Sequence, residues 1–213
     1  MIKINGNDVF KDNKFDWYSW SADVLQSPAE LREAFDKLNL IGKRIVDLLA
    51  IGDEFSGADY DGSGKSHILS VSSWQPFIFV FDDGDRLEID FSEMTSVRMS
   101  MNCFPPELED IEPLPDIIDG KRFIAPCMGS KIIGMDICVW DECPGFRFTG
   151  SYDITLNPNQ ENYIGNFDLL LDNGLKIRFE AHFDDGYIYI FDANGNSVWT
   201  TSIWDNEREA TGK

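Results

Sequence analysis

The chain has 213 residues, 38 of them Asp or Glu and 18 Lys or Arg, so its formal net charge is -20. Hydrophobic residues make up 43% and aromatic residues 13%, which is enough apolar material for a packed core and excludes a wholly disordered chain. Phosphate repels such a negative chain, so we expect neither general nucleic-acid binding nor binding to anionic membranes.

The N-terminus shows no basic region followed by an apolar run, and no apolar stretch approaches the roughly 20 residues of a membrane helix. We therefore expect a soluble, cytoplasmic protein. The four cysteines, which are Cys103, Cys127, Cys138 and Cys143, form no C-x-x-C pair. Four cysteines in a chain this long make no disulfide framework, so we expect reduced thiols, with Cys138 buried in an apolar strand.

One helix is predicted near the N-terminus. Ser27 is a capping residue, Pro28 suits the first helical position, and Glu30 completes a capping box. Apolar residues then recur at helical spacing, which predicts an amphipathic helix over about Pro28 to Asn39. We assign residues 1–40 to an N-terminal hairpin and this helix.

Most of the remaining chain has the pattern of β-strands. The apolar run 77–81 is followed by a D-D-G-D turn and by alternation over 86–91, which predicts a hairpin with one buried face. A second hairpin is predicted over 167–180, around the turn Asp172-Asn173-Gly174. With further strands at 187–191 and 197–199, the C-terminal part is predicted to be a four-stranded antiparallel meander.

The two hairpins align with each other without a gap at an offset of 90 residues, so that Phe77 corresponds to Phe167 and Gly84 to Gly174. At the same offset Val97 and Met99 align with Tyr187 and Tyr189. Upstream, the segment 42–46 resembles the segment 120–124 at a different offset. Two generic hairpins would share turn residues and alternation, but the ungapped match favours an internal duplication.

The fold class is therefore predicted to be mainly β, α+β at most, with two related antiparallel β-units and one N-terminal amphipathic helix. We place the first unit at 41–105 and the second at 118–204, with a polar tail at 205–213. The segment 106–117 between the units is rich in proline and acids and contains no basic residue, which is typical of a linker.

The segment Asp59 to Ser66 ends in Gly-Lys-Ser, like a phosphate-binding loop. An aspartate stands where such a loop needs its first glycine, and no helix is predicted to follow. As a calcium loop it lacks the carboxylate required at its twelfth position, which is Ser70. We expect a loop between two strands and leave open whether it binds an ion.

Catalytic and metal-binding signatures are sparse. His67 and His182 are the only histidines, no cysteine pair has zinc-ligand spacing, and no G-x-S-x-G motif is present. Two carboxylates suffice for glycoside hydrolysis, but no pair stands out among 38 acids. We expect no enzyme activity, no cofactor and no metal site.

An aromatic cluster lies in the N-terminal segment, where Trp17 and Tyr18 stand beside acids. It is interpreted either as an edge strand packed on the core, which we favour, or as a stacking platform for sugars or a partner protein. The Trp and Tyr clusters are the basis for an alternative function, a carbohydrate-binding or carbohydrate-processing β-protein. A structural, oligomer-forming protein is a third alternative, and the oligomeric state is left open.

Both halves of the chain carry more acids than bases, which serves solubility and also speeds encounter with a cationic partner. In composition the chain resembles bacterial immunity proteins, which block toxins such as cationic nucleases. This resemblance implies a non-enzymatic, acidic protein-binding module and transfers no site residues. The predicted contact surface consists of the acids at the hairpin turns: Asp82, Asp83, Asp85, Asp172, Asp184 and Asp185.

Overall fold

The computed structural model describes residues 22–50, 76–93, 96–103, 123–139, 164–182 and 185–198. It also describes the backbone of eight short strands: β1 (Lys3–Ile4), β2 (Asn7–Asp8), β3 (Phe10–Lys11), β4 (Lys14–Phe15), β7 (Ala58–Tyr60), β8 (Ser66–Ile68), β9 (Ser70–Ser73) and β17 (Thr200–Thr201). Within these parts of the chain, no helix has the length and apolarity needed to cross a bilayer.

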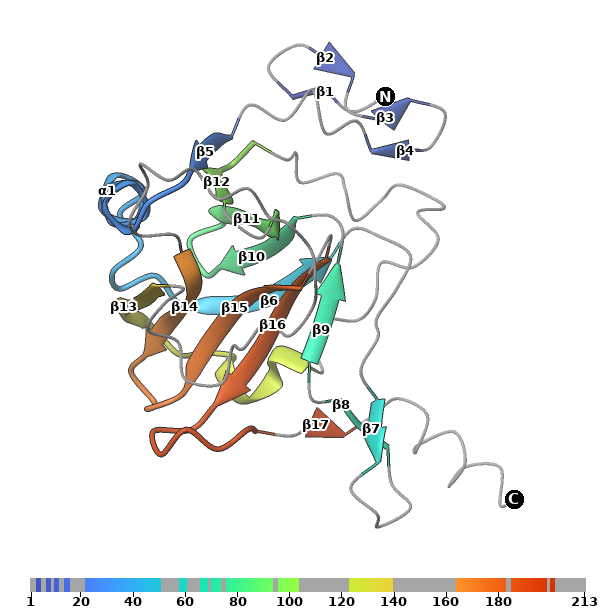
Figure 1. The fold of residues 1–213 in the computed structure, drawn as a ribbon, viewed down its shortest axis with the longest axis vertical. Helices are drawn as coiled ribbons and strands as arrows, with labels where there is room; N and C mark the ends of the chain where they lie inside the picture. Colours follow the sequence, from blue (N-terminus) through green and yellow to red (C-terminus); the bar gives the residue numbers. More distant parts are fainter. Residues whose placement is uncertain are drawn as a thin grey trace, which may run out of the picture.

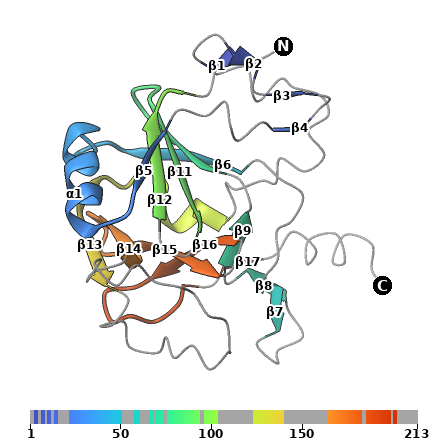
Figure 2. The same cartoon turned by 45° about the horizontal axis from the view of Figure 1, so that its top comes forward.

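Two five-stranded antiparallel sheets form the body of the protein (Figures 1 and 2). The first has the order β5 (Asp23–Leu25), β12 (Ser96–Met101), β11 (Arg86–Glu93), β10 (Phe77–Phe81) and β6 (Ile45–Ala50). The second has the order β13 (Ile132–Val139), β14 (Ile164–Leu171), β15 (Lys176–His182), β16 (Asp185–Phe191) and β9. The mainly β fold class predicted from the sequence is confirmed.

Helix α1 (Pro28–Lys37) begins as predicted, because Ser27 and Glu30 form the complete capping box. It ends two residues before the predicted end, and the following Asn39 has a positive φ of 52°. Leu31 and Phe35 are buried in the core, and the helix contacts both β5 and β13. It therefore covers one side of the molecule and touches both sheets (Figure 2).

The sheets pack face to face on a single apolar core, in which β11 contacts β15 and β16. Phenylalanine rings fill its centre. Phe167 and Phe179 are stacked with ring centroids 4.6 Å apart, and Phe79 meets Phe179 edge-on at 5.8 Å. Such aromatic pairs stabilise a core beyond the area they bury. The cluster thus joins a strand of the first sheet to two strands of the second.

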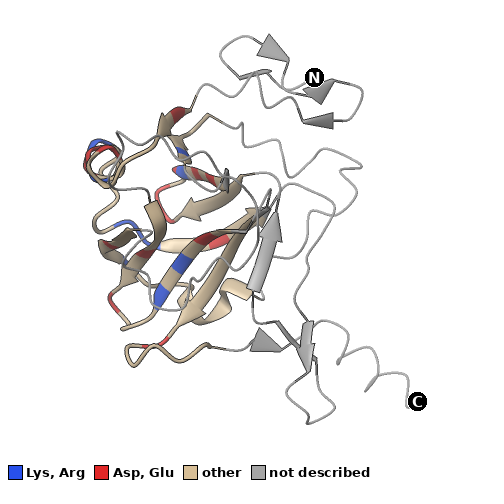
Figure 3. Cartoon of the chain, viewed as in Figure 1, with Lys and Arg blue, Asp and Glu red and all other residues tan. Residues whose placement is uncertain are grey.

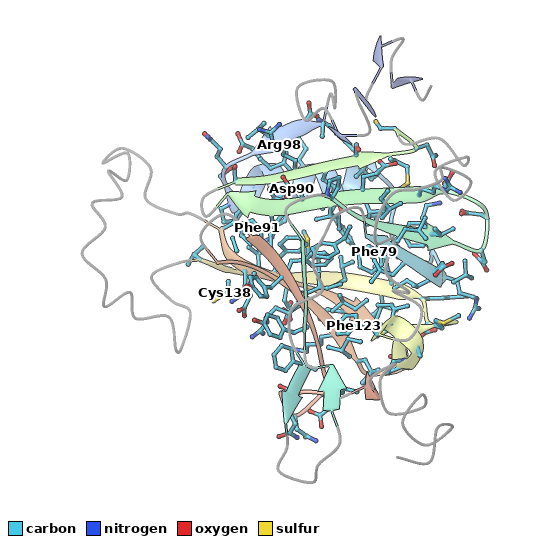
Figure 4. All side chains as sticks on the ribbon, turned by 90° about the vertical axis from the view of Figure 1, so that its right-hand side faces the viewer. Phe79, Asp90, Phe91, Arg98, Phe123 and Cys138 are labelled. Atoms are coloured by element: carbon cyan, nitrogen blue, oxygen red, sulfur yellow. The ribbon has the colours of Figure 1, made fainter. Side chains whose placement is uncertain are left out.

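The first hairpin differs from its prediction, because both of its faces are buried. Leu87, Ile89 and Phe91 point into the core, as the alternation indicates. The opposite face also excludes solvent: Glu88 is 0% exposed and Asp90 is 3% exposed. Figure 4 shows Asp90 on the side of the first sheet away from Phe79 and Phe91. Alternation locates a polar face, but it does not establish that water reaches it.

The predicted C-terminal meander is partly wrong. β14, β15 and β16 follow one another as expected, but Ser197 makes only an isolated bridge to Phe191. The fourth and fifth strands of this sheet are β13 and β9, and β9 comes from residues that precede the first hairpin. The prediction took residues 197–199 as the edge strand because they follow β16 directly in the chain. The strand that pairs with β16 is instead β9, which lies more than a hundred residues earlier in the sequence.

The edges of the two sheets meet where β6 and β13 begin. Arg44 and Lys131 form a bridge there, Ile45 N–H donates to Ser130 O (3.0 Å), and Ile132 N–H donates to Lys43 O (2.9 Å). Two further bonds are reciprocal in the same way: Gly42 N–H to Ile132 O and Gly129 N–H to Ile45 O, both 2.8 Å. Both glycines have positive φ, 87° and 79°. We call residues 42–45 and 129–132 the β6–β13 junction.

The junction bears on one of the sequence matches. The hydrogen bonds made by residues 42–45 are repeated by residues 129–132. Ile124, which the sequence match aligned with Val46 of β6, has helical φ and ψ, and residues 120–122 of that match lie outside the described residues. The strands that follow the two hairpins, β12 and β16, differ in register by one residue. Ile89 pairs with Met99, whereas its counterpart Phe179 pairs with Ile188 and not with Tyr189, which the sequence match aligned with Met99. The register within the two hairpins is the same at the 90-residue offset. The duplication as the origin of this likeness stays a prediction, as do the domain boundaries.

The tight contact at Gly186 gives a first prediction. A Cβ atom there would lie 3.3 Å from the backbone carbon of Phe91, in the opposing sheet. Since backbone cannot move aside cheaply, we expect Gly186→Ala to lower the free energy of unfolding by about 1–3 kcal/mol. The matched control is Gly134→Ala, whose Cβ would meet only the Leu170 side chain at 3.5 Å. Urea denaturation measures both, and equal stabilities would contradict the prediction.

Candidate functional site

The acids of the first hairpin turn lie against two basic residues of the β6–β13 junction. The Lys43 ammonium is 2.6 Å from Asp83 Oδ2 and also contacts Asp85 Oδ2, and it lies over the Phe81 ring. Arg44 Nε is 3.4 Å from Asp82 Oδ2. The Lys43 side chain is only 10% exposed. Three carboxylates thus face two cations, and this turn is largely neutralised from within.

Hydrogen bonds fix the ionisation of this turn. The hydrogen bond from Lys43 is the largest cause of the lowered pKa of both Asp83 and Asp85, and the Asn102 amide, 2.9 Å from Asp85 Oδ1, adds to it at Asp85. Burial lowers the pKa of Lys43, but its bonds to the two carboxylates outweigh that effect and raise it overall. The ion pairs are therefore fully formed at neutral pH.

The second hairpin turn reaches the same end of the molecule. Asp172 N–H donates to Lys131 O, as Asp82 N–H does to Arg44 O, at 2.9 and 3.0 Å. Asp172 Oδ1 in turn accepts the Lys131 backbone N–H at 2.9 Å. The structure therefore brings four of the six predicted acids to the junction, namely Asp82, Asp83, Asp85 and Asp172.

The remaining predicted site residues are elsewhere or outside the description. Asp185 begins β16 and pairs with His182, so its backbone lies at the far end of the second sheet from Asp172. Asp184, Trp17 and Tyr18 lie outside the described residues. The backbone of Asp185 is therefore separated from the four acids at the junction by the length of β15.

The outer face of the second sheet carries a polar and aromatic group that the sequence analysis did not single out. Tyr187, Tyr189 and Phe191 follow one another along one face of β16, with ring centroids 6.3 and 6.1 Å apart. We call these three residues the aromatic row. Their spacing of two residues on a strand is the signal that could have found them. All three side chains are half-buried.

A charged pair lies beside the aromatic row. Arg178 donates to both carboxylate oxygens of Asp168, at 2.7 and 3.0 Å, and its guanidinium carbon lies 4.7 Å from the centroid of the Phe191 ring. The hydrogen bond to Asp168 is the main cause of the raised pKa of Arg178. This bidentate, ring-stacked geometry fixes the guanidinium plane, which a lysine could not reproduce.

Among the described residues, no three His, Cys, Asp or Glu side chains are grouped as metal ligands. Cys103, Cys127 and Cys138 are free thiols. The fully buried one is Cys127 rather than Cys138, and burial raises its pKa to about 12. β7 and β8 pair antiparallel, which confirms that the Asp59 to Ser66 segment joins two strands, while residues 61–65 themselves lie outside the description.

Charges of both signs are interleaved on the described surface. Figure 3 shows acidic and basic residues side by side on α1 and on the second sheet. No family model, curated protein or solved structure matches the chain. The functional argument therefore depends on the charge and geometry of the chain's own residues.

Removing the charge of Lys43 tests the electrostatics of the first turn. We expect Lys43→Met, which keeps the contact with Phe81, to lower the free energy of unfolding at neutral pH by about 1 kcal/mol per pair or less, because the carboxylates are partly exposed. The stabilisation from lowered Asp pKa values is present above about pH 4 and is lost as the pH falls through the folded-state values.

The difference between wild type and Lys43→Met should therefore shrink from pH 7 towards pH 2, as measured by urea denaturation. Lys176→Met is the control, because its ammonium is 4.0 Å from the exposed Asp136 carboxylate. A difference that stays constant over this range would show that the ion pairs do not stabilise the turn.

Proposed function

We propose that this chain is a non-enzymatic protein-binding module that recognises a cationic protein, in the manner of immunity-type inhibitors of cationic bacterial toxins. The observation that carries the proposal is the net charge of -20, with an acid excess in both halves of the chain. Such a field steers a cationic partner towards the protein and speeds association.

The geometry of the hairpin turns limits how they would take part. Asp83 and Asp85 already hold Lys43, so a partner would have to compete with an internal ammonium for their oxygens. Asp83 and Asp85 contribute to the long-range electrostatic attraction of a cationic partner. Direct ion pairs with that partner require carboxylates that are less strongly paired within the chain. The mutual approach of the two turns at the β6–β13 junction supports a common surface at that end, with Asp82 and Asp172 as its members.

Capture from extract of the native cells tests the proposal. With the full chain immobilised, we expect a basic protein to be retained at about 0.05 M salt and released towards 1 M, because the Debye length falls to about 3 Å. The control column carries an unrelated protein of similar net charge, since any polyanion retains some basic proteins. Recovery of the same proteins from both columns, or of none, would refute a specific cationic partner.

A second candidate function is carbohydrate binding, and the aromatic row favours it. Sugar rings stack on aromatic faces, and fixed polar groups beside the row, such as the Arg178–Asp168 pair, could donate to and accept from hydroxyl groups. This surface differs from the predicted Trp17 and Tyr18 cluster, but the chemistry is the same.

A glycan panel distinguishes this alternative. We expect a binding glycan to lose affinity about tenfold on Tyr189→Ala, because the ring face is removed from the middle of the row, whereas Tyr189→Phe keeps the ring and retains affinity. Isothermal calorimetry with the best glycan of the panel measures both. Equal affinity of wild type and Tyr189→Ala, or no binding by any glycan, would count against sugar recognition on this face.

A further inference from the structure

A groove lies between helix α1 and the edge strand β5. It has a volume of about 250 Å³ and is lined by Asp23, Val24, Leu25, Glu30, Glu33, Ala34 and Lys37. In the described part of the first sheet, β5 is the last strand and pairs with β12 alone. A strand in this position can accept another strand along its second edge. We call this feature the α1–β5 groove.

The groove combines negative charge with exposed apolar surface. Asp23, Glu30 and Glu33 supply three carboxylates against the single ammonium of Lys37. Val24 is 45% exposed and lies beside the buried Leu25, so the groove offers apolar surface to solvent. Long basic side chains match such a surface, because their methylene stems cover apolar atoms while their charged ends reach carboxylates.

The groove already holds one ammonium group. Lys37 Nζ lies 2.8 Å from Glu33 Oε1. The hydrogen bond to Glu33, then the charge of Glu33 and, to a smaller extent, that of Asp23 raise the pKa of Lys37. Both partners of this pair remain about two-thirds exposed, so the ion pair is solvated and easily exchanged. Glu30 differs, because it accepts the Gln26 and Ser27 backbone N–H groups at 2.8 and 3.0 Å and is needed for the helix cap.

We propose that the α1–β5 groove receives an extended, cationic segment of the partner protein. A basic side chain of that segment takes the place of Lys37 between Asp23 and Glu33, and a neighbouring aliphatic side chain packs on Val24. This inference rests on the proposed function, since it names the surface that a cationic protein would use. The arguments for this occupant are the charge complementarity and the free edge of β5 among the described strands.

The probe is a seven-residue peptide of alternating Lys and Val with blocked ends, added to the isotope-labelled full chain. We expect the largest backbone amide shifts at residues 23–25 and 30–37. The double variant Asp23→Asn, Glu33→Gln should bind the peptide about tenfold more weakly. Lys37→Met should bind it more tightly, because the internal competitor is gone. A peptide of alternating Glu and Val should not bind.

Matched variants separate this local effect from net charge. The double variant Asp36→Asn, Asp136→Asn removes two negative charges outside the groove and so matches Asp23→Asn, Glu33→Gln. Lys176→Met removes one positive charge outside the groove and so matches Lys37→Met. Both controls should leave the peptide affinity unchanged. Each variant must first show the wild-type urea midpoint. If the groove variants behave like these controls, or if the amide shifts centre on residues 82–85 and 172–174, the groove assignment is wrong while the proposed function stands.

Two further outcomes decide between the proposals. If light scattering shows a dimer and the peptide fails to bind it, a second copy of the chain occupies the groove and the assignment is overturned. If a captured basic protein binds the wild type and the double variant with equal affinity, the partner uses another surface and only the groove is rejected. If no cationic partner is captured and the peptide does not bind, both proposals fail.

Discussion

The reciprocal hydrogen bonds between the starts of β6 and β13 determine much of this structure. Two sheet edges meet there over a few residues, and the positive φ of Gly42 and Gly129 allows each chain to turn into its strand beside the other. Each strand then pairs with the first strand of a hairpin, β10 or β14, so both hairpin turns return to the same junction. The phenylalanine core can form because the joined sheets close on each other from this shared corner.

The junction also explains why the acidic turn is not a free acidic surface. The backbone bond between Asp82 and Arg44 holds the first turn against residues 43 and 44, and both of these are basic. In the second turn the corresponding positions are Ser130 and Lys131, and there the carboxylate of Asp172 accepts a backbone N–H instead. The same backbone geometry therefore supports a cluster of ion pairs in one turn and a hydrogen bond from a backbone N–H to a carboxylate in the other.

Local patterns were enough to predict the helix start and both hairpins with their turns, because capping, turn formation and alternation depend on residues only a few positions apart. The sequence did not reveal which strands complete each sheet. β5 and β9 reach their partners over long stretches of chain, and β9 crosses into the second sheet, so no local signal marks the pairing. Burial of Glu88 and Asp90 was equally hidden, since alternation shows which residues share a face and not what covers it.

The candidate sites follow the same division between local and long-range information. The acid-rich turns are visible in the sequence, yet their internal cations come from residues some 40 positions away, and only the fold shows that those carboxylates are already engaged. The α1–β5 groove has the opposite character. Its acids come from a helix and a short strand that sequence reading treats as separate elements, and their neutralising lysine is solvated rather than buried. A basic side chain of a partner must displace the internal lysine before it can pair with these carboxylates. Lys37 is solvated and Lys43 is nearly buried, so the α1–β5 groove is a better candidate for recognition than the first hairpin turn.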